Sequence, residues 1–176
     1  MQPTDPAWIG LKQREKLLLK KYAEAWNAEL PAWARHRAPT FYRGFPEISC
    51  QIDDWLRGAR NLVKLFPLFR VNMKVTSKTL AKLVASPNVA NLTGLHLWHC
   101  GLGSDTARAI GASPHLAGLT RLVMGENRVA AEGIAALAES SHLMSLVQLN
   151  LRSNHFGPDG GNAIVPVEVV KQEANG

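Results

Sequence analysis

Cysteine is scarce in this 176-residue chain, and long apolar runs are missing from it. The two cysteines, Cys50 and Cys100, lie in unrelated segments. A disulfide-stapled secreted scaffold is therefore excluded, and a reduced, cytoplasmic protein is expected. No apolar run reaches the roughly 18–20 residues that span a bilayer. Residues 1–6 also lack the basic and apolar regions of a secretory signal. We expect no membrane partner.

A concentrated basic segment is also lacking. The net charge is +6, yet residues 1–60 carry ten Lys and Arg against seven Asp and Glu, and residues 61–176 carry the same numbers. Binding by neutralisation of phosphates usually needs a denser basic footprint, so nucleic acid is not an expected partner. With 46% hydrophobic and 19% charged residues, the composition is typical of a folded protein rather than a disordered one.

Motifs that mark common enzymes are absent as well. The chain has no P-loop, no Gly-x-Ser-x-Gly elbow and no His-Glu-x-x-His pair. Gly101 and Gly103 lack the third glycine of a dinucleotide-binding loop. His115 and His142 occupy equivalent places in two copies of a repeated pattern, but two histidines alone are fewer than the usual ligand set of a zinc site. No enzymatic activity, cofactor or metal is expected.

That repeated pattern is what the chain does contain, and it returns with a fixed period of 27 from residue 65 onward. Its clearest copy is Leu92-x-x-Leu95-x-Leu97-x-x-Cys100-x-Leu102, and it recurs over residues 119–129 and 146–156. A weaker copy at the same spacing consists of Leu65, Leu68, Arg70, Met73 and Val75. This period predicts stacked units, because one unit cannot bury its apolar face alone.

Each unit has a strand half and a helix half. Alternation with a period of two points Leu95 and Leu97 inward together, as in a strand. Apolar residues at helical spacing then predict helices over residues 77–83, 105–110, 132–137 and 159–164. Asp105 and Glu132 fall in first helical turns, where a negative charge favours the helix dipole. We expect an α/β fold: a curved right-handed solenoid with parallel strands inside and helices outside.

Cys100 has two interpretations. Beside His99 and near His96, it could form a nucleophile–base pair. Its position in the repeat, however, is the one that Asn127 and Asn154 occupy in the later copies. At this position a small side chain turns inward and hydrogen-bonds backbone groups between neighbouring loops. We therefore expect Cys100, Asn127 and Asn154 to form a structural ladder.

Residues 1–61 precede the repeats and are expected to form an N-terminal cap. A helix is predicted over residues 6–34, ending or kinking at Pro31. Its apolar stripe consists of Trp8, Leu11, Leu18, Tyr22, Trp26 and Leu30. We expect the stripe to face the core and cover the first repeat, although its lysines and tryptophans also fit a helix on a membrane surface.

Two short segments, residues 40–45 and 47–52, are expected to form a hairpin or two edge strands. A helix capped by Asp53 or Asp54 should follow them. The repeats then occupy residues 62–165, and Pro166 interrupts the last predicted helix. We expect an irregular C-terminal tail over residues 166–176.

Over residues 62–164 the pattern closely resembles leucine-rich repeats of the ribonuclease-inhibitor type. Arg70 and Met73 depart from that pattern, which suggests a capping repeat at the start. The segments Gln13-Arg14-Glu15-Lys16-Leu17-Leu18, Ala25-Trp26 and Tyr42-Arg43-Gly44-Phe45 also look like the linker of bacterial repeat-companion-domain proteins. This second resemblance implies a shortened member of that group, without its small N-terminal domain.

Side chains that alternate with the inward leucines should line up as rows on the inner rim, about 4.8 Å apart from strand to strand. The predicted rows are Pro67, Gly94, Arg121, Gln148; then Phe69, His96, Val123, Asn150; then Val71, Trp98, Gly125, Arg152. An exposed Trp98 among arginines and polar groups is typical of a protein-binding hot spot. The candidate binding residues are His96, Trp98, Arg121, Glu126, Gln148, Asn150 and Arg152.

The predicted function is a non-catalytic scaffold that binds an unidentified protein or peptide on the concave face of the repeats. Ran GTPase-activating proteins are similar to this repeat family, which implies a small-GTPase regulator as an alternative, although they have far more repeats. A degenerate remnant without a partner is a further alternative. An uncapped C-terminal repeat could also form a homodimer.

Overall fold

The chain forms one sheet whose strands are neighbours in the order of the sequence. The computed structural model describes residues 6–35, 40–42, 45–65, 69–155 and 168–169. The strands are β1 (Thr40–Tyr42), β2 (Phe45–Gln51), β3 (Phe69–Lys74), β4 (Leu92–His96), β5 (Arg121–Val123), β6 (Gln148–Asn150) and β7 (Glu168–Val169). Strand β1 is antiparallel to β2, and all later pairs are parallel, so β2 to β6 form a parallel sheet that β7 extends.

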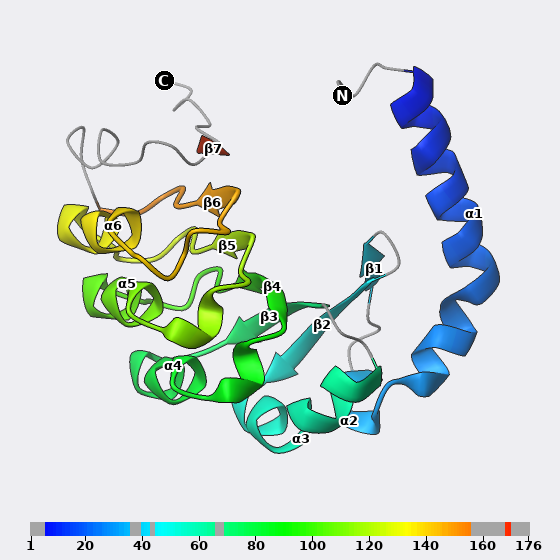
Figure 1. Ribbon diagram of the computed structural model, residues 1–176, viewed down its shortest axis with the longest axis horizontal. Helices are drawn as coiled ribbons and strands as arrows, with labels where there is room; N and C mark the ends of the chain where they lie inside the picture. The colour runs from blue at the N-terminus through cyan, green and yellow to red at the C-terminus, as the bar shows by residue number, and fades with distance from the viewer. Residues whose placement is uncertain (1–5, 36–39, 43–44, 66–68, 156–167, 170–176) are drawn as a thin grey trace.

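Helices alternate with the parallel strands, and α4, α5 and α6 stack along one side of the sheet (Figure 1). The helices are α1 (Pro6–Glu29), α2 (Ala32–Arg35), α3 (Ile52–Leu65), α4 (Ser77–Val84), α5 (Ser104–Gly111) and α6 (Ala131–Ala138), with short 3-10 helices η1 (Pro87–Val89) and η2 (Pro114–Leu116). The helices predicted over residues 77–83, 105–110 and 132–137 are confirmed, whereas 159–164 lies outside the described residues. Asp105 and Glu132 lie in first turns, as expected.

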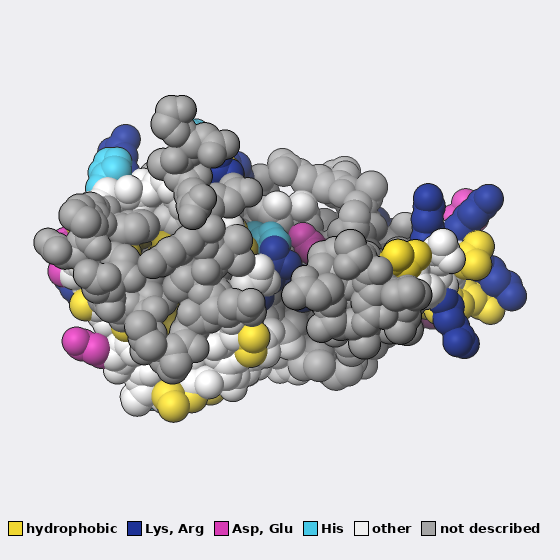
Figure 2. Space-filling model, turned by 90° about the horizontal axis from the view of Figure 1, so that it is seen from above, with side chains coloured by type: hydrophobic (Ala, Val, Ile, Leu, Met, Phe, Trp, Pro, Cys, Tyr) yellow, Lys and Arg dark blue, Asp and Glu magenta, His cyan; other side chains and the backbone are white. Residues whose placement is uncertain are grey.

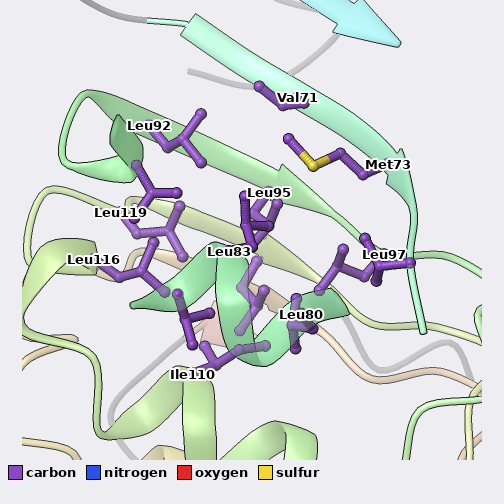
Figure 3. Packing of buried hydrophobic residues seen from close by; sticks show 14 of the residues in the cluster. Val71, Met73, Leu80, Leu83, Leu92, Leu95, Leu97, Ile110, Leu116 and Leu119 are labelled. Atoms are coloured by element: carbon purple, nitrogen blue, oxygen red, sulfur yellow. The ribbon is translucent and has the colours of Figure 1, made fainter. Parts of the chain in front are cut away.

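Two columns of apolar side chains run from strand to strand and form the core. The first column is Ile48, Val71, Leu95, Leu122 and Leu149, and none of its members is more than 3% exposed. The second is Cys50, Met73, Leu97, Met124 and Leu151, each at most 8% exposed. Figure 3 shows members of both columns packing toward Leu80, Leu83 and Ile110 of the stacked helices. The core therefore lies between the sheet and these helices.

Strand β3 is offset from the predicted period. Val71 pairs with Leu95, whereas the repeat pattern places Leu68 opposite Leu95. The expected register, with Leu68 and Arg70 at inward positions, is wrong: Arg70 pairs with Gly94 on the opposite face of the sheet. Helices α4 and α5 still begin one full period apart, so the whole difference lies in a shorter connection between β3 and α4.

The hairpin predicted over residues 40–52 is confirmed, but β2 is not an edge strand. Its second side pairs with β3 from Glu47 to Gln51. Helix α3 follows, and its Trp55 and Leu62 side chains are fully buried in the common core. Strand β2 and helix α3 thus add a strand–helix unit to the N-terminal side of the array without the leucine pattern.

The N-terminal helix breaks at Pro31, as predicted, because α1 ends at Glu29 and α2 begins at Ala32. The described middle of its apolar stripe does not face the core, because Leu18 and Tyr22 are 43% and 38% exposed. Among the described side chains of the stripe, Trp26 near the end of α1 and Leu30 just after the helix pack against the core. In Figure 1, α1 extends away from the rest of the chain. The expectation fails because β2 and α3 already occupy the place beside the first repeat.

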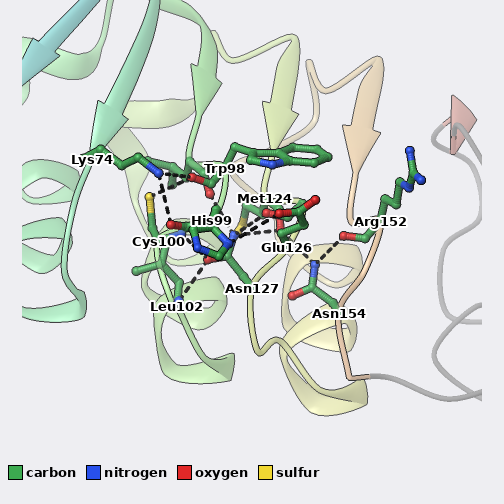
Figure 4. Close-up of polar contacts among 12 residues, drawn as sticks. Lys74, Trp98, His99, Cys100, Leu102, Met124, Glu126, Asn127, Arg152 and Asn154 are labelled. Carbon is green, nitrogen blue, oxygen red and sulfur yellow. Dashed lines mark hydrogen bonds and ion pairs between the residues drawn. The ribbon is translucent and has the colours of Figure 1, made fainter.

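Asn127 joins neighbouring loops at the ends of the strands (Figure 4). Its Oδ1 accepts hydrogen bonds from the backbone N–H groups of Cys100 and Leu102, both at 3.0 Å. Its Nδ2 donates to the backbone oxygens of Leu97, Met124 and Gly125 at 2.8–3.0 Å. One buried amide therefore satisfies five backbone groups of two repeats.

The neighbouring ladder positions make related contacts. Asn154 accepts from Val129 N at 2.9 Å and donates to Met124 O and Leu151 O at 2.8 Å. The Cys100 thiol, which has no amide, donates to Met73 O at 3.5 Å and to Trp98 O at 3.4 Å. Cys100 thus makes fewer and longer bonds than the asparagines.

We predict that Asn127→Ala lowers the free energy of unfolding by roughly 2–5 kcal/mol, because it leaves buried backbone donors and acceptors without partners. The measurement is urea unfolding followed by circular dichroism. Asn88→Ala is the matched control, since its amide makes a single 3.5 Å contact with Leu56 O. It should cost less than about 1 kcal/mol. Equal losses in the two variants would contradict the ladder.

Candidate functional site

The front face is defined here as the strand side chains of β2 to β6 that alternate with the two buried columns, together with the turn residues after β4, β5 and β6. Its first row is Glu47, Arg70, Gly94, Arg121 and Gln148, and its second row is Ser49, Asn72, His96, Val123 and Asn150. All seven candidate binding residues come from β4, β5, β6 and their turns. Because β3 is offset, Arg70 and Asn72 occupy the places in the first and second rows that were predicted for Pro67 and Phe69.

Trp98 lies across the neighbouring repeat. A Cβ atom built on Gly125 would fall 2.2 Å from Cζ3 of the Trp98 ring, so the ring occupies the space that a side chain at position 125 would need. Figure 4 shows the ring extending from the end of β4 toward β5 and β6. The Trp98 side chain is half-buried. Contact with the glycine backbone therefore fixes one side of the ring and leaves part of it accessible.

Lys74 holds the turn that carries Trp98, although the sequence did not single it out. Its Nζ donates to Trp98 O at 3.1 Å and to His99 O at 3.2 Å. Lys74 is the last residue of β3. The strict repeat period predicted that Val71 would occupy this place in the row that contains Trp98. Only the correct register of β3 could have revealed this lysine.

The residues before the ladder positions adopt left-handed backbone conformations. The φ angles of His99, Glu126 and Ser153 are 52°, 54° and 57°. This conformation is uncommon for non-glycine residues, and its return at each turn shows that the turn geometry requires it. His99 and Glu126 also pair across the turns, with 3.4 Å between Nδ1 and Oε2. Both side chains are well exposed.

Asn150 and Arg152 lie at the last described turn. The Asn150 Oδ1 accepts from Arg152 N at 3.0 Å, so this side chain stabilises the turn as well as lining the front face. Arg152 itself is exposed. Gln148 pairs in register with Arg121 and is half-buried.

His96 occupies a charged and partly buried cluster in the middle of the sheet. Its Nδ1 lies 3.7 Å from Glu47 Oε1, and the two side chains are 17% and 28% exposed. Burial lowers the pKa of His96 from its ordinary 6.5, the Glu47 carboxylate opposes that shift, and Arg121 and Arg70 add to it. The Nε2 of His96 and the Nε of Arg121 are buried and have no hydrogen-bond partner within the part of the chain that the structure describes.

Charged side chains of both signs reach the surface on this part of the molecule. In Figure 2, a histidine adjoins basic and acidic side chains near the middle of the view. Within the described residues, no group of three or more His, Cys, Asp and Glu side chains is placed to hold a metal ion. None of the helices in that same part of the chain has the length and apolarity to cross a bilayer.

A family model described as Leucine Rich repeat matches residues 142–165. The match begins just before β6 and covers the third clear copy of the repeated pattern. It supports a leucine-rich repeat protein. No curated protein matches the chain.

The depressed pKa of His96 gives a signed prediction for pH. Below 6.5 the unfolded chain binds a proton that folded His96 does not, so the contribution of this residue to stability is complete above 6.5 and decreases as pH falls toward the lower folded pKa. We predict that the free energy of unfolding decreases less with falling pH in His96→Gln than in the wild type.

The measurement is the free energy of unfolding in urea between about pH 5 and pH 8. His142→Gln is the control, because it leaves the cluster around His96 intact and should keep the wild-type pH dependence. If both variants keep that dependence, the assignment to His96 is incorrect.

Proposed function

We propose that the protein is a non-catalytic interaction module that holds a protein or peptide on its front face. The leucine-rich repeat match favours a protein-interaction role, because such repeats generally serve as binding modules. The parallel strands present neighbouring rows of side chains on one surface, while the helices cover the other side. A rigid surface of this kind favours recognition, since little conformational freedom is lost on binding.

The observation that carries the proposal is the position of Trp98 on Gly125. A tryptophan that is already held in place loses little side-chain entropy when a partner covers it, and tryptophan is enriched among the residues that dominate binding energies. Exposed Arg152 and Glu126 and half-buried Asn150 lie around the same turns. They would form the polar rim around an aromatic centre.

We also propose a repeat type, a curvature and domain bounds for the chain. We take the repeats to be of the ribonuclease-inhibitor type in a curved right-handed solenoid, with residues 1–61 as a cap, 62–165 as repeats and 166–176 as a tail. Strand order and the asparagine contacts support the repeat type. A bacterial, cytoplasmic relative of the repeat-companion-domain proteins is part of the same proposal. Dimerisation through the last repeat stays a prediction, because residues 156–165 lie outside the described part.

The test compares partner capture by the wild type and by a Trp98→Ala, Arg152→Ala double variant. Tagged proteins are incubated with a lysate of the native host, and bound proteins are identified and quantified by mass spectrometry. We expect the double variant to lose the specific partners, because loss of a central tryptophan typically weakens binding by about 2 kcal/mol or more. Circular dichroism verifies that each variant is folded.

The matched control is a Lys82→Ala, Arg108→Ala double variant, which removes exposed charges from α4 and α5 on the helix side of the sheet. It should retain the wild-type partners. Identical partner sets for the wild type and the front-face variant would exclude the front face as the binding surface.

A further inference from the structure

Two arginines flank a glycine in the first row of the front face. Arg70 pairs with Gly94 on β4, and Gly94 pairs with Arg121 on β5. A Cβ atom on Gly94 would lie 2.7 Å from Cγ and 3.2 Å from Cδ of Arg70, so the stem of Arg70 lies over the glycine. Arg70 therefore leans from β3 across β4, toward the strand that carries Arg121. The missing side chain of Gly94 leaves both arginines facing one space.

His96 faces the same space from β4. It stands two residues beyond Gly94, so it is a diagonal neighbour of Arg70 on one side and of Arg121 on the other. Both arginine charges act on the imidazole, which agrees with this placement. Glu47 on β2 is the acidic side chain that faces His96 within the described residues. Among the described residues, His96 therefore lies near the side chains of Arg70, Arg121 and Glu47.

The cluster holds polar atoms that no described residue satisfies. The Nε of Arg121 is a buried donor without an acceptor among the described residues. The Nε2 of His96 is buried and unpaired in the same way. Buried polar atoms are normally hydrogen-bonded, so the Arg121 N–H points to an acceptor supplied from outside the chain, and a protonated His96 can donate to the same acceptor through Nε2.

We propose that Arg121, His96 and Arg70 form a subsite for a carboxylate of the bound partner, an acidic side chain of a protein or peptide. This inference rests on the proposed function and names the chemistry of the partner. Arg121 donates to the carboxylate through its guanidinium fork, and Arg70 contributes its charge without donating. The net charge of +6 attracts acidic partners at longer range.

Occupancy of the subsite couples to the protonation of His96. The Nδ1 of His96 faces Glu47, so a protonated imidazole can also donate from Nε2 to the bound carboxylate. The bound anion offsets the effect of Arg70 and Arg121, and the pKa of His96 therefore rises in the complex. The complex then binds a proton more tightly than the free protein does, so affinity increases as pH falls through the pKa that His96 has in the complex.

The probe is a library of short random peptides displayed on phage and selected on the full chain. We expect the selected peptides to be enriched in Asp and Glu. A synthetic peptide from the selection should bind Arg121→Gln about tenfold more weakly or worse, because a charge-assisted hydrogen bond is lost. Arg121→Lys, which keeps the charge but not the fork, should bind at an intermediate level. Arg108→Gln on α5 is the matched control and should bind as the wild type does.

A second arm changes the peptide instead of the protein, so that its result is independent of the folding of any variant. Replacing the selected acidic residue by its amide should weaken binding to the wild type by about tenfold, and this loss should largely vanish on Arg121→Gln. Nuclear magnetic resonance titration should show a higher pKa for His96 in the complex. Additive losses, or an unchanged pKa, would overturn the subsite.

The outcomes also separate this inference from the proposed function. Peptides selected without acidic residues, whose binding is lost in Trp98→Ala, would overturn the carboxylate subsite and leave the interaction module in place. Failure to select any peptide on the wild type would count against both.

Discussion

Each strand of this protein buries its inward side chains only because the strands before and after it stand in matching register. Leu122 is fully buried between Leu95 and Leu149, which come from the neighbouring units. Asn127 applies the same constraint to the polar groups, since its amide satisfies backbone atoms of two loops at once. A unit taken alone would expose its leucines and its loop carbonyls, so stability is shared between neighbours.

The same constraint determines which side chains form the front face. Because the inward positions are fixed, every alternate residue is placed on the opposite surface at a set distance from its counterparts. Glycines at two of these positions leave space for larger neighbours: Trp98 lies over Gly125, and Arg70 lies over Gly94. The face is therefore preorganised by backbone contact. The proposed recognition of a partner with an apolar and an acidic group rests on this arrangement.

The repeat period predicted the helices α4, α5 and α6 and the neighbouring placement of Leu95, Leu122 and Leu149, because these features follow from the periodic pattern itself. It failed at β3, where a shorter connection to α4 shifts the register of the strand while the helix keeps its phase. Composition alone does not encode such a shift. For the same reason Lys74 and Arg70 could not be assigned to the front face from sequence.

Strand β2 was not predicted to belong to the array, because Ile48 and Cys50 fill the two columns of the core and β2 has no leucine at these positions. The exposure of α1 depends on β2 and α3 occupying its expected place, which is a tertiary effect.

The register of the parallel strands is the claim on which the core, the ladder and the front face all depend. Nuclear Overhauser contacts between backbone protons of neighbouring strands measure it directly in solution. We predict contacts that place Val71 opposite Leu95, and Leu95 opposite Leu122. Contacts that place Leu68 opposite Leu95, as a strict repeat period requires, or the absence of contacts between β4 and β5, would contradict this account.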